Sequence, residues 1–148
     1  MNTTTNDTVI GVWPTLVYRD GQAALKFLTE GLGFTLVASY AGVAEDSIAH
    51  AELAWPAGGG VMVSSLGRNA VPNEFDHLAD QVQSVYLVCA DPDALWPQVI
   101  AAGATVVREM RDEDYGSRGF SVADPEGNVW SIGTYRGEIG ALSTGGQQ

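Results

Sequence analysis

The apolar residues in the first half of the chain predict a strand, a helix and three further strands. Runs of alternating or continuous apolar side chains place these strands at residues 9–18, 34–40, 47–55 and 61–66. The helix is expected over residues 22–30, because Ala23, Phe27 and other apolar residues recur there on one helical face. Asp20 can cap the start of this helix, and Gly33 can end it.

The second half of the chain repeats this order of elements. Its strands are expected at residues 82–90, 104–108, 117–123 and 128–135. A helix should begin after Asp91, with Pro92 in its first turn, and reach Ala102 with a local distortion at Pro97. The remaining segments are expected to be loops at residues 67–81 and 110–116 and a flexible tail at residues 136–148.

Landmark residues recur between the two halves at a nearly constant spacing. Val17, Asp20 and Ala23 recur with their spacing unchanged as Val88, Asp91 and Ala94. In the same way Gly33 and Thr35 recur as Gly103 and Thr105, and Pro56 and Gly58 recur as Pro125 and Gly127. The offset between matched residues falls slightly along the chain, which indicates single-residue length differences between two copies of one unit. We therefore expect a single domain over residues 9–135, built from repeats at about 9–66 and 82–135 with a linker at 67–81.

Composition and charge narrow the functional classes. The chain has 148 residues, of which 18 are acidic and 7 are Lys or Arg, giving a net charge of −11. A surface of this sign repels phosphate backbones and anionic lipids, so neither nucleic acid nor a membrane is an expected partner. No apolar run is long enough to cross a membrane, and the N-terminus lacks the pattern of a signal peptide. With a single cysteine, Cys89, the chain is expected to be cytoplasmic.

The most specific motif lies near the end of the second repeat. It consists of Tyr115-Gly116-Ser117-Arg118 followed by Asp124-Pro125-Glu126-Gly127-Asn128-Val129-Trp130. This stretch, together with the repeated order of elements, resembles the vicinal oxygen chelate superfamily of glyoxalase I, extradiol dioxygenases and bleomycin-resistance proteins. The resemblance implies an α+β fold in which tandem βαβββ modules form curved mixed sheets with helices on the convex side. Taken by itself, Asp-Pro-x-Gly is also the chemistry of a tight hairpin turn.

The same resemblance implies where a metal would bind. Members that use a metal place one ligand on the first and fourth strand of each repeat, which correspond here to Trp13, Met62, Ser84 and Ser131. None of these side chains is an imidazole or a carboxylate, the ligands that such a divalent metal requires. We therefore expect neither a metal nor another cofactor.

Strand alternation predicts which side chains face the concave side of the sheets. The candidates for a ligand-binding cavity are Trp13, Thr15, His50, Glu52, Met62, Ser84, Tyr86 and Ser131. Trp13 and Tyr86 would supply stacking surfaces, or would be ordinary packing residues. His50 and Glu52 stand two apart, so they can form an acid–base pair or simply be solvated. Arg118 could clamp a ligand anion, or it could pair with an acid in residues 111–114.

Three functional hypotheses follow. The first is a metal-independent small-molecule binding protein that resembles the drug-binding resistance proteins, with a planar or cationic ligand. The second is a metal-independent lyase or isomerase that uses His50 and Glu52 as acid and base. The third is an interaction module without a pocket. A homodimer is also expected, because members of this family cover open sheets by pairing modules within or between chains.

Overall fold

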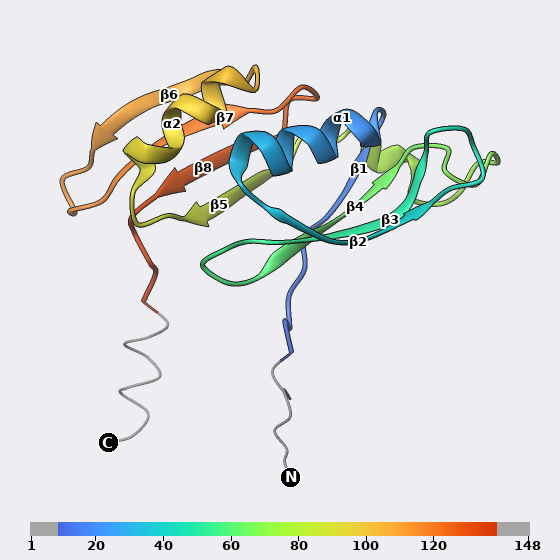
Figure 1. Ribbon diagram of the computed structural model, residues 1–148, viewed down its shortest axis with the longest axis horizontal. Coiled ribbons are helices and arrows are strands. Elements are labelled where there is room, and N and C mark those ends of the chain that lie inside the picture. Colours follow the sequence, from blue (N-terminus) through green and yellow to red (C-terminus); the bar gives the residue numbers. More distant parts are fainter. Residues whose placement is uncertain (1–8, 139–148) are drawn as a thin grey trace, which may run out of the picture. The chain divides into compact units, whose positions relative to one another are not determined.

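The structure of the protein is a computed structural model that describes residues 9–138 (Figure 1). The chain divides into two compact units, Met1–Val82 and Gln83–Gln148, which are described separately below. Most of the tail expected over residues 136–148 lies outside the described residues. Among the residues that are described, no helix is long and apolar enough to cross a membrane.

The first unit is a four-stranded sheet with one helical layer. Its elements are β1 (Thr15–Tyr18), α1 (Gly21–Lys26), the π-helical segment η1 (Phe27–Leu32), β2 (Thr35–Ala41), β3 (Ile48–Ala54), β4 (Gly60–Ser65) and the 3-10 segment η2 (Asp76–Asp80). The strand order is β1-β4-β3-β2, in which β1 is parallel to β4 and the other pairs are antiparallel. Asp20 caps α1 by accepting a hydrogen bond from the amide of Ala23.

The second unit has the same connectivity. Its elements are β5 (Ser84–Val88), α2 (Pro92–Ala101), β6 (Thr105–Asp112), β7 (Arg118–Ala123) and β8 (Val129–Gly133). The strand order β5-β8-β7-β6, with β5 parallel to β8, reproduces the order of the first sheet. The predicted α+β class, with tandem βαβββ modules that form curved mixed sheets, is confirmed (Figure 1). We refer to the two units as the first and second module.

Three predicted elements differ from the structure. The first strand starts at Thr15 rather than at residue 9, because Pro14 has no amide hydrogen for the ladder and contributes only its carbonyl, which accepts from Met62. β6 extends to Asp112, where a charged loop was expected, because its polar residues lie on an edge strand facing solvent. α2 continues through Pro97 without a break.

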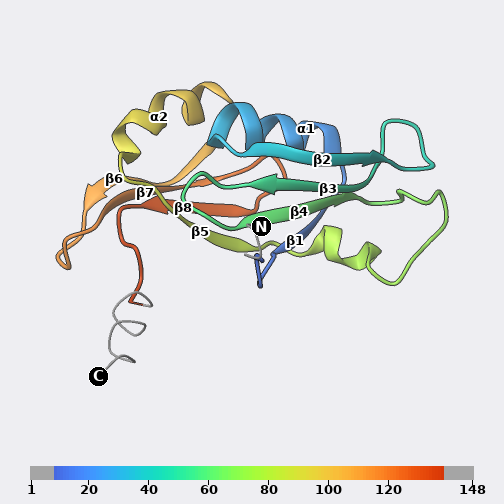
Figure 2. The ribbon, with the colours of Figure 1, turned by 60° about the horizontal axis from the view of Figure 1, so that its bottom comes forward.

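In the first sheet, side chains alternate between a buried face under α1 and an open face. Leu16, Tyr18, Val61 and Val63 are almost completely buried. Gly21 at the start of α1 lies directly on this face, where a side chain at position 21 would collide with Ser65 and Ile48. Figure 2 shows α1 on one side of the sheet and the yellow-green segment η2 on the other.

The side chains of the second sheet also divide between two faces, but burial along β7 does not alternate, because Gly119 and Ser121 on the second face are buried as well. Leu87, Phe120, Trp130 and Ile132 are buried, and Trp96 of α2 packs edge-on against Phe120 with ring centroids 4.9 Å apart. The faces that contact α1 and α2 therefore hold the cores of the two modules, and we call the opposite faces the open faces.

Matching rows of residues cross the two open faces. In the first module, Thr15, Met62, Glu52 and Ala38 are neighbours on β1, β4, β3 and β2. In the second module, Tyr86, Ser131, Ser121 and Arg108 are neighbours on β5, β8, β7 and β6. Each residue of the second row is the counterpart, in the sequence repeat, of the residue at the same place in the first row.

Candidate functional site

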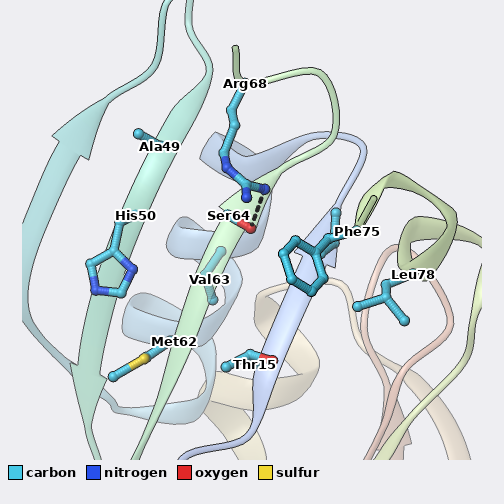
Figure 3. A pocket seen from close by; sticks show the side chains of 10 residues that line it. Thr15, Ala49, His50, Met62, Val63, Ser64, Arg68, Phe75 and Leu78 are labelled. Atoms are coloured by element: carbon cyan, nitrogen blue, oxygen red, sulfur yellow. Dashed lines mark hydrogen bonds between the residues drawn. The ribbon is translucent and has the colours of Figure 1, made fainter. Parts of the chain in front are cut away.

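A pocket of about 220 Å³ opens on the free face of the first sheet (Figure 3). It lies entirely within the first module, between three strands and the segment that follows β4. The residues that line it are Thr15, Val17, Ala49, His50, Met62, Val63, Ser64, Arg68, Phe75 and Leu78. Most of these side chains are apolar, and a few polar groups stand among them, which is the usual character of a small-molecule site.

The floor of the pocket is formed by β1 and β4. Thr15 lies beside Met62 and Val17 lies beside Ser64 in the parallel ladder, so these four side chains form a continuous patch. The sequence predicted that Thr15 and Met62 face the open side, and the structure brings both to the pocket.

The cover of the pocket comes from residues 67–81, which the sequence predicted only as a linker. Phe75 and Leu78 line the pocket from this segment. The segment is held by a local turn, in which Asp76 accepts from the amide of Asn73 and Asn73 accepts from the amide of Phe75. An ion pair between Arg19 and Asp80 fastens its far end to the residue that follows β1. The signal in the sequence for this cover was the pair Phe75 and Leu78, two large apolar residues three apart in a segment rich in polar residues.

Arg68 supplies the charged side chain of the pocket lining. The sequence did not identify it as a site residue. It is half-buried and its guanidinium donates to the hydroxyl of Ser64 at 3.2 Å. Its backbone carbonyl accepts from the amide of Val43 at 2.7 Å, which ties this turn to the loop between β2 and β3. The side chain therefore extends over the sheet from an anchored backbone (Figure 3).

His50 and Glu52 form the pair that the sequence allowed. The Nε2 atom of His50 lies 2.8 Å from the Oε2 atom of Glu52, and about a third of each side chain is exposed. Tyr40 stacks beside His50 from β2, with ring centroids 6.4 Å apart. Of these residues, only His50 lines the pocket, and Glu52 contacts its ring from outside the lining.

Trp13 lies on the same open face, beyond the end of the pocket. Gly60, Met62 and Ser64 share one face of β4, and a side chain at Gly60 would collide with the ring of Trp13. The indole Nε1 of Trp13 donates to the carbonyl of Ile10 at 3.1 Å. Trp13 is therefore placed next to the pocket and is not among the residues that line it.

The other predicted site residues belong to the second module. Ser131 shares a 2.7 Å hydrogen bond with Ser121 on the neighbouring strand. Tyr86 extends over Gly133, and its hydroxyl donates to the carbonyl of Tyr135 at 2.8 Å. Partial burial raises the pKa of the Tyr86 hydroxyl. Ser84 begins β5 and is exposed.

Arg118 is engaged by acids of its own module. Its guanidinium donates to both carboxylate oxygens of Asp93 on α2, at 2.7 and 3.0 Å, and to Asp112 on β6 at 3.2 Å. The expected pairing with an acid of residues 111–114 is confirmed by Asp112, and Asp93 is a further partner. These contacts lower the pKa of the Asp93 carboxyl and raise that of the guanidinium.

The Asp-Pro-Glu-Gly-Asn turn is organised around the buried side chain of Asp124. Its carboxylate accepts hydrogen bonds from the amides of Glu126 and Asn128, from the side chain of Asn128 and from the indole of Trp130. These bonds close the turn between β7 and β8 and fix the largest buried side chain of the module. The hairpin interpretation of this motif therefore has a direct structural basis.

The residues at the family's metal positions do not fit a metal. Trp13, Met62, Ser84 and Ser131 offer an indole, a thioether and two hydroxyls, which do not form a ligand set for the divalent ions of such sites. Across residues 9–138, no group of three or more His, Cys, Asp or Glu side chains could hold a metal ion.

The sequence profile of the Glyoxalase/Bleomycin resistance protein/Dioxygenase superfamily matches residues 11–132. The chain belongs to this superfamily. Curated relatives in this comparison are uncharacterized proteins, Rv0887c of Mycobacterium tuberculosis and Mb0911c of Mycobacterium bovis. Each is 42% identical over 50 residues, which is 34% of this chain. The match spans 29% of the length of the first relative and 33% of the second, about a third of each.

Solved structures of similar proteins agree with the fold. TioX from Micromonospora sp. ML1 is 27% identical, with a TM-score of 0.68 over 85% of this chain and all of its own. UcmS2 is 20% identical, with a TM-score of 0.63 over 82% of this chain and 95% of its own. A superfamily enzyme from Burkholderia phytofirmans PsJN is also 20% identical, with a TM-score of 0.58 over 82% of this chain and 94% of its own. At 20% identity the last two neighbours bear on the fold alone.

Proposed function

We propose that this chain is a metal-independent binding protein for small organic molecules. The observation that carries the proposal is the pocket on the open face of the first sheet, with its apolar floor and its cover from residues 67–81. Superfamily membership supports a ligand-binding role, and the residues at the family's metal positions argue against metal-dependent chemistry. The protein would hold its ligand without changing it.

The dimensions of the pocket favour a compact, flat ligand. A volume of about 220 Å³ is below the range of roughly 300–1,000 Å³ that is usual for drug-sized ligands. A bicyclic aromatic group, or the aromatic end of a larger molecule, fits such a space. The ring of Phe75 faces this space, and Trp13 lies farther along the same face as a second stacking surface within the proposal.

An alternative proposal is a metal-independent lyase or isomerase. It is favoured by the 2.8 Å contact between His50 and Glu52, which orients the imidazole beside the pocket as in an acid–base pair. The two proposals differ in one respect, namely whether a bound ligand is recovered unchanged. A His50→Gln variant would abolish turnover under the alternative and would change only affinity under the binding proposal.

The proposal is tested by filling the pocket. A Val17→Trp substitution places an indole in the open-face patch, whereas Val107→Trp adds the same group at an exposed position of β6. We expect 1-naphthylmethanol to bind the wild type and Val107→Trp with one saturable site per chain, and to bind Val17→Trp at least about 10-fold more weakly. Mass spectrometry should recover the alcohol unchanged. Equal binding by all three proteins would contradict the proposal.

Homodimerisation is part of the same proposal. Open sheet faces of this family are covered by pairing modules, and a two-fold arrangement is the default for identical chains. Light scattering at micromolar concentration should give twice the 15.6 kDa mass of the chain. A mass that stays at the monomer value would remove dimerisation and leave the pocket proposal intact.

A further inference from the structure

The acidic character of the chain does not extend into its pocket. The net charge of −11 favours a cationic ligand at long range. Among the residues that line the pocket, however, none is acidic, and the one that carries a full charge is Arg68. Neither Glu52, which is bonded to His50, nor Asp76 of the cover, which accepts from the amide of Asn73, is part of the lining.

Arg68 is also available for a ligand. The arginines at positions 19, 108, 111 and 118 all form ion pairs with carboxylates, whereas Arg136, which is exposed, forms none within residues 9–138. Over residues 9–138, Arg68 forms no ion pair, although the chain contains 18 acidic residues, and its one side-chain hydrogen bond goes to the neutral hydroxyl of Ser64. A guanidinium has five N–H donors, so four remain for other acceptors.

The position of Arg68 is defined by its surroundings. Its backbone carbonyl is bonded to Val43, and its guanidinium is bonded to Ser64 on β4. In the close-up view the guanidinium lies between the strand of His50 and the segment of Phe75, at one end of the pocket, and Met62 and Thr15 lie toward the other end (Figure 3). The pocket is therefore polar and cationic at one end and apolar at the other.

From this arrangement we infer that the ligand carries an anionic oxygen group, such as an aromatic carboxylate, which Arg68 binds while the apolar ring lies over Met62 and beside Phe75. The inference rests on the proposed binding function and names its ligand class. A guanidinium binds a planar carboxylate through two parallel hydrogen bonds, and such charge-assisted bonds are stronger than neutral ones. The hydroxyl of Ser64 aligns the guanidinium without neutralising it.

The net charge of the chain and the charge of Arg68 should act on different quantities, namely the rate of association and the affinity. The net negative field slows the approach of an anion, and it is screened over about 8–10 Å at ordinary ionic strength. The contact with Arg68 acts at hydrogen-bond distance in a half-buried site, where screening is weaker. Affinity at physiological salt should therefore follow Arg68, and the rate of association should follow the net charge.

The experiment compares three probes that share one ring system and differ in charge. These are 1-naphthoate, 1-naphthylmethanol and 1-naphthylmethylammonium, measured by isothermal titration at about 0.15 M salt. We expect 1-naphthoate to bind at least about 10-fold more tightly than the ammonium compound. Arg68→Gln should lower the affinity for 1-naphthoate about 10-fold and should leave that for the neutral alcohol within about 2-fold.

Matched variants separate the local charge from the net charge. Lys26→Gln removes the same unit of charge from the exposed side of α1, on the opposite face of the sheet, and should leave the order of the three affinities unchanged. Arg68→Lys keeps the charge but loses the two-point geometry, so it should retain a reduced preference for 1-naphthoate. Circular dichroism establishes that each variant is folded.

The outcomes distinguish the inference from the function on which it rests. If the neutral alcohol binds the wild type and 1-naphthoate binds no better than the ammonium compound, the anionic ligand class is wrong and the binding proposal stands. If no probe binds, or if Val17→Trp binds all three as the wild type does, the pocket itself is not the site. If Lys26→Gln weakens 1-naphthoate binding as much as Arg68→Gln does, the preference comes from net charge and the role of Arg68 is wrong.

Discussion

Residues at matching positions of the two open faces carry different chemistry. Across the first sheet the central row contains Thr15, Met62 and Glu52, and across the second it contains Tyr86, Ser131 and Ser121. In the first module the segment after β4 folds back and covers this face, which produces the pocket. In the second module, the polar groups of the row satisfy one another or nearby backbone.

The comparison indicates that one scaffold can form a pocket on one module and use the matching face of the other module for structural support. The first module keeps Arg68 and an imidazole at its pocket, and neither Arg68 nor its neighbour Ser64 brings a carboxylate there. On the corresponding face of the second module, Arg108 is paired with Glu113, and the rest of the row consists of two serines and a tyrosine. The signature motif lies in the second module and organises its core through Asp124. The residues of the signature motif and the residues that form the pocket therefore belong to different halves of the chain.

The turn between the last two strands of each module gives the largest expected difference in stability between the modules. Asp124 is buried and accepts hydrogen bonds from two backbone amides and two side chains, whereas the turn at residues 55–59 is closed by backbone bonds and by Gly58 and Gly59 at positive φ. Asp124→Ala removes the carboxylate that accepts from a buried indole N–H and a buried amide. We expect it to lower the free energy of unfolding by about 3 kcal/mol in urea titrations.

The matched control for that experiment is Pro56→Ala in the first module. It removes only the restriction that proline places on the unfolded chain, which is about 0.4–1 kcal/mol. Hydrogen exchange should place the loss caused by Asp124→Ala in residues 84–133. Equal losses of unfolding free energy for the two variants would mean that the two turns are stabilised in equivalent ways, and would contradict the difference described between the modules.

Removing the cover should affect ligand binding and leave the fold intact. Phe75 is about half exposed, and Leu78 stands three residues later on the same segment, so a Phe75→Ala/Leu78→Ala double variant loses little core packing. We expect the affinity for 1-naphthylmethanol to fall about 10–30-fold, which corresponds to about 1.4–2 kcal/mol. Titration calorimetry measures the change. Tyr115→Ala, an exposed aromatic of the second module, should leave the affinity unchanged.

Substitutions at Ser121 and Ser131 test whether the open face of the second module contributes to stability. Ser131→Ala leaves the buried hydroxyl of Ser121 without its 2.7 Å partner and should cost about 1 kcal/mol in unfolding free energy. The double variant Ser121→Ala/Ser131→Ala removes both polar groups and should cost less than the sum of the two single changes. A double-mutant cycle with no coupling would show that the bond contributes nothing to stability.

The smallest expected effect concerns the ion pair that only the second module has. In the sequence repeat, the positions of Asp93 and Arg118 correspond to Gln22 and Ala49 of the first module, which cannot form such a pair. Because Arg118 lowers the pKa of Asp93, the contact stabilises the fold above the ordinary pKa of an aspartate and is lost as the pH falls through the lowered value.

Asp93→Asn should therefore be slightly less stable than the wild type near pH 7, and the difference should shrink below roughly pH 4. Thermal melts of both proteins across this range measure the effect. A difference that stays constant or grows with acidification would rule out the ion pair as its cause.

The sequence predicted the architecture well because its signals are local and repeated. The alternation of apolar residues in residues 48–54 and 60–65, the cap at Asp20 and the glycine at position 33 each act within a few residues, and the repeat supplied every signal twice. The same alternation predicted that Thr15, His50 and Met62 share one face, and all three line the pocket of the first module. The contact between His50 and Glu52 followed from their spacing of two residues along a strand.

What the sequence did not reveal depends on tertiary contacts of an irregular segment. Phe75 and Leu78 lie in a stretch without a strand or helix period, so no face could be assigned to them. Arg68 lies three residues after β4, and only the turn bonded to Val43 directs its side chain back to Ser64. Trp13 was expected to lie in a strand, but Pro14 delays the start of β1, so its ring packs at Gly60.

The π-helical segment η1 accounts for a difference in length between the two modules. Thirteen positions separate Asp20 from Gly33, but twelve separate Asp91 from Gly103, although each pair brackets the helix of its module and both glycines have positive φ. The first module thus contains one additional residue between fixed ends, and the wider turn at Phe27–Leu32 absorbs it. An insertion accommodated in this way leaves the capping residue, the closing glycine and every strand in register. Duplicated modules of this kind can therefore change length inside a helix without altering the sheet on which the pocket lies.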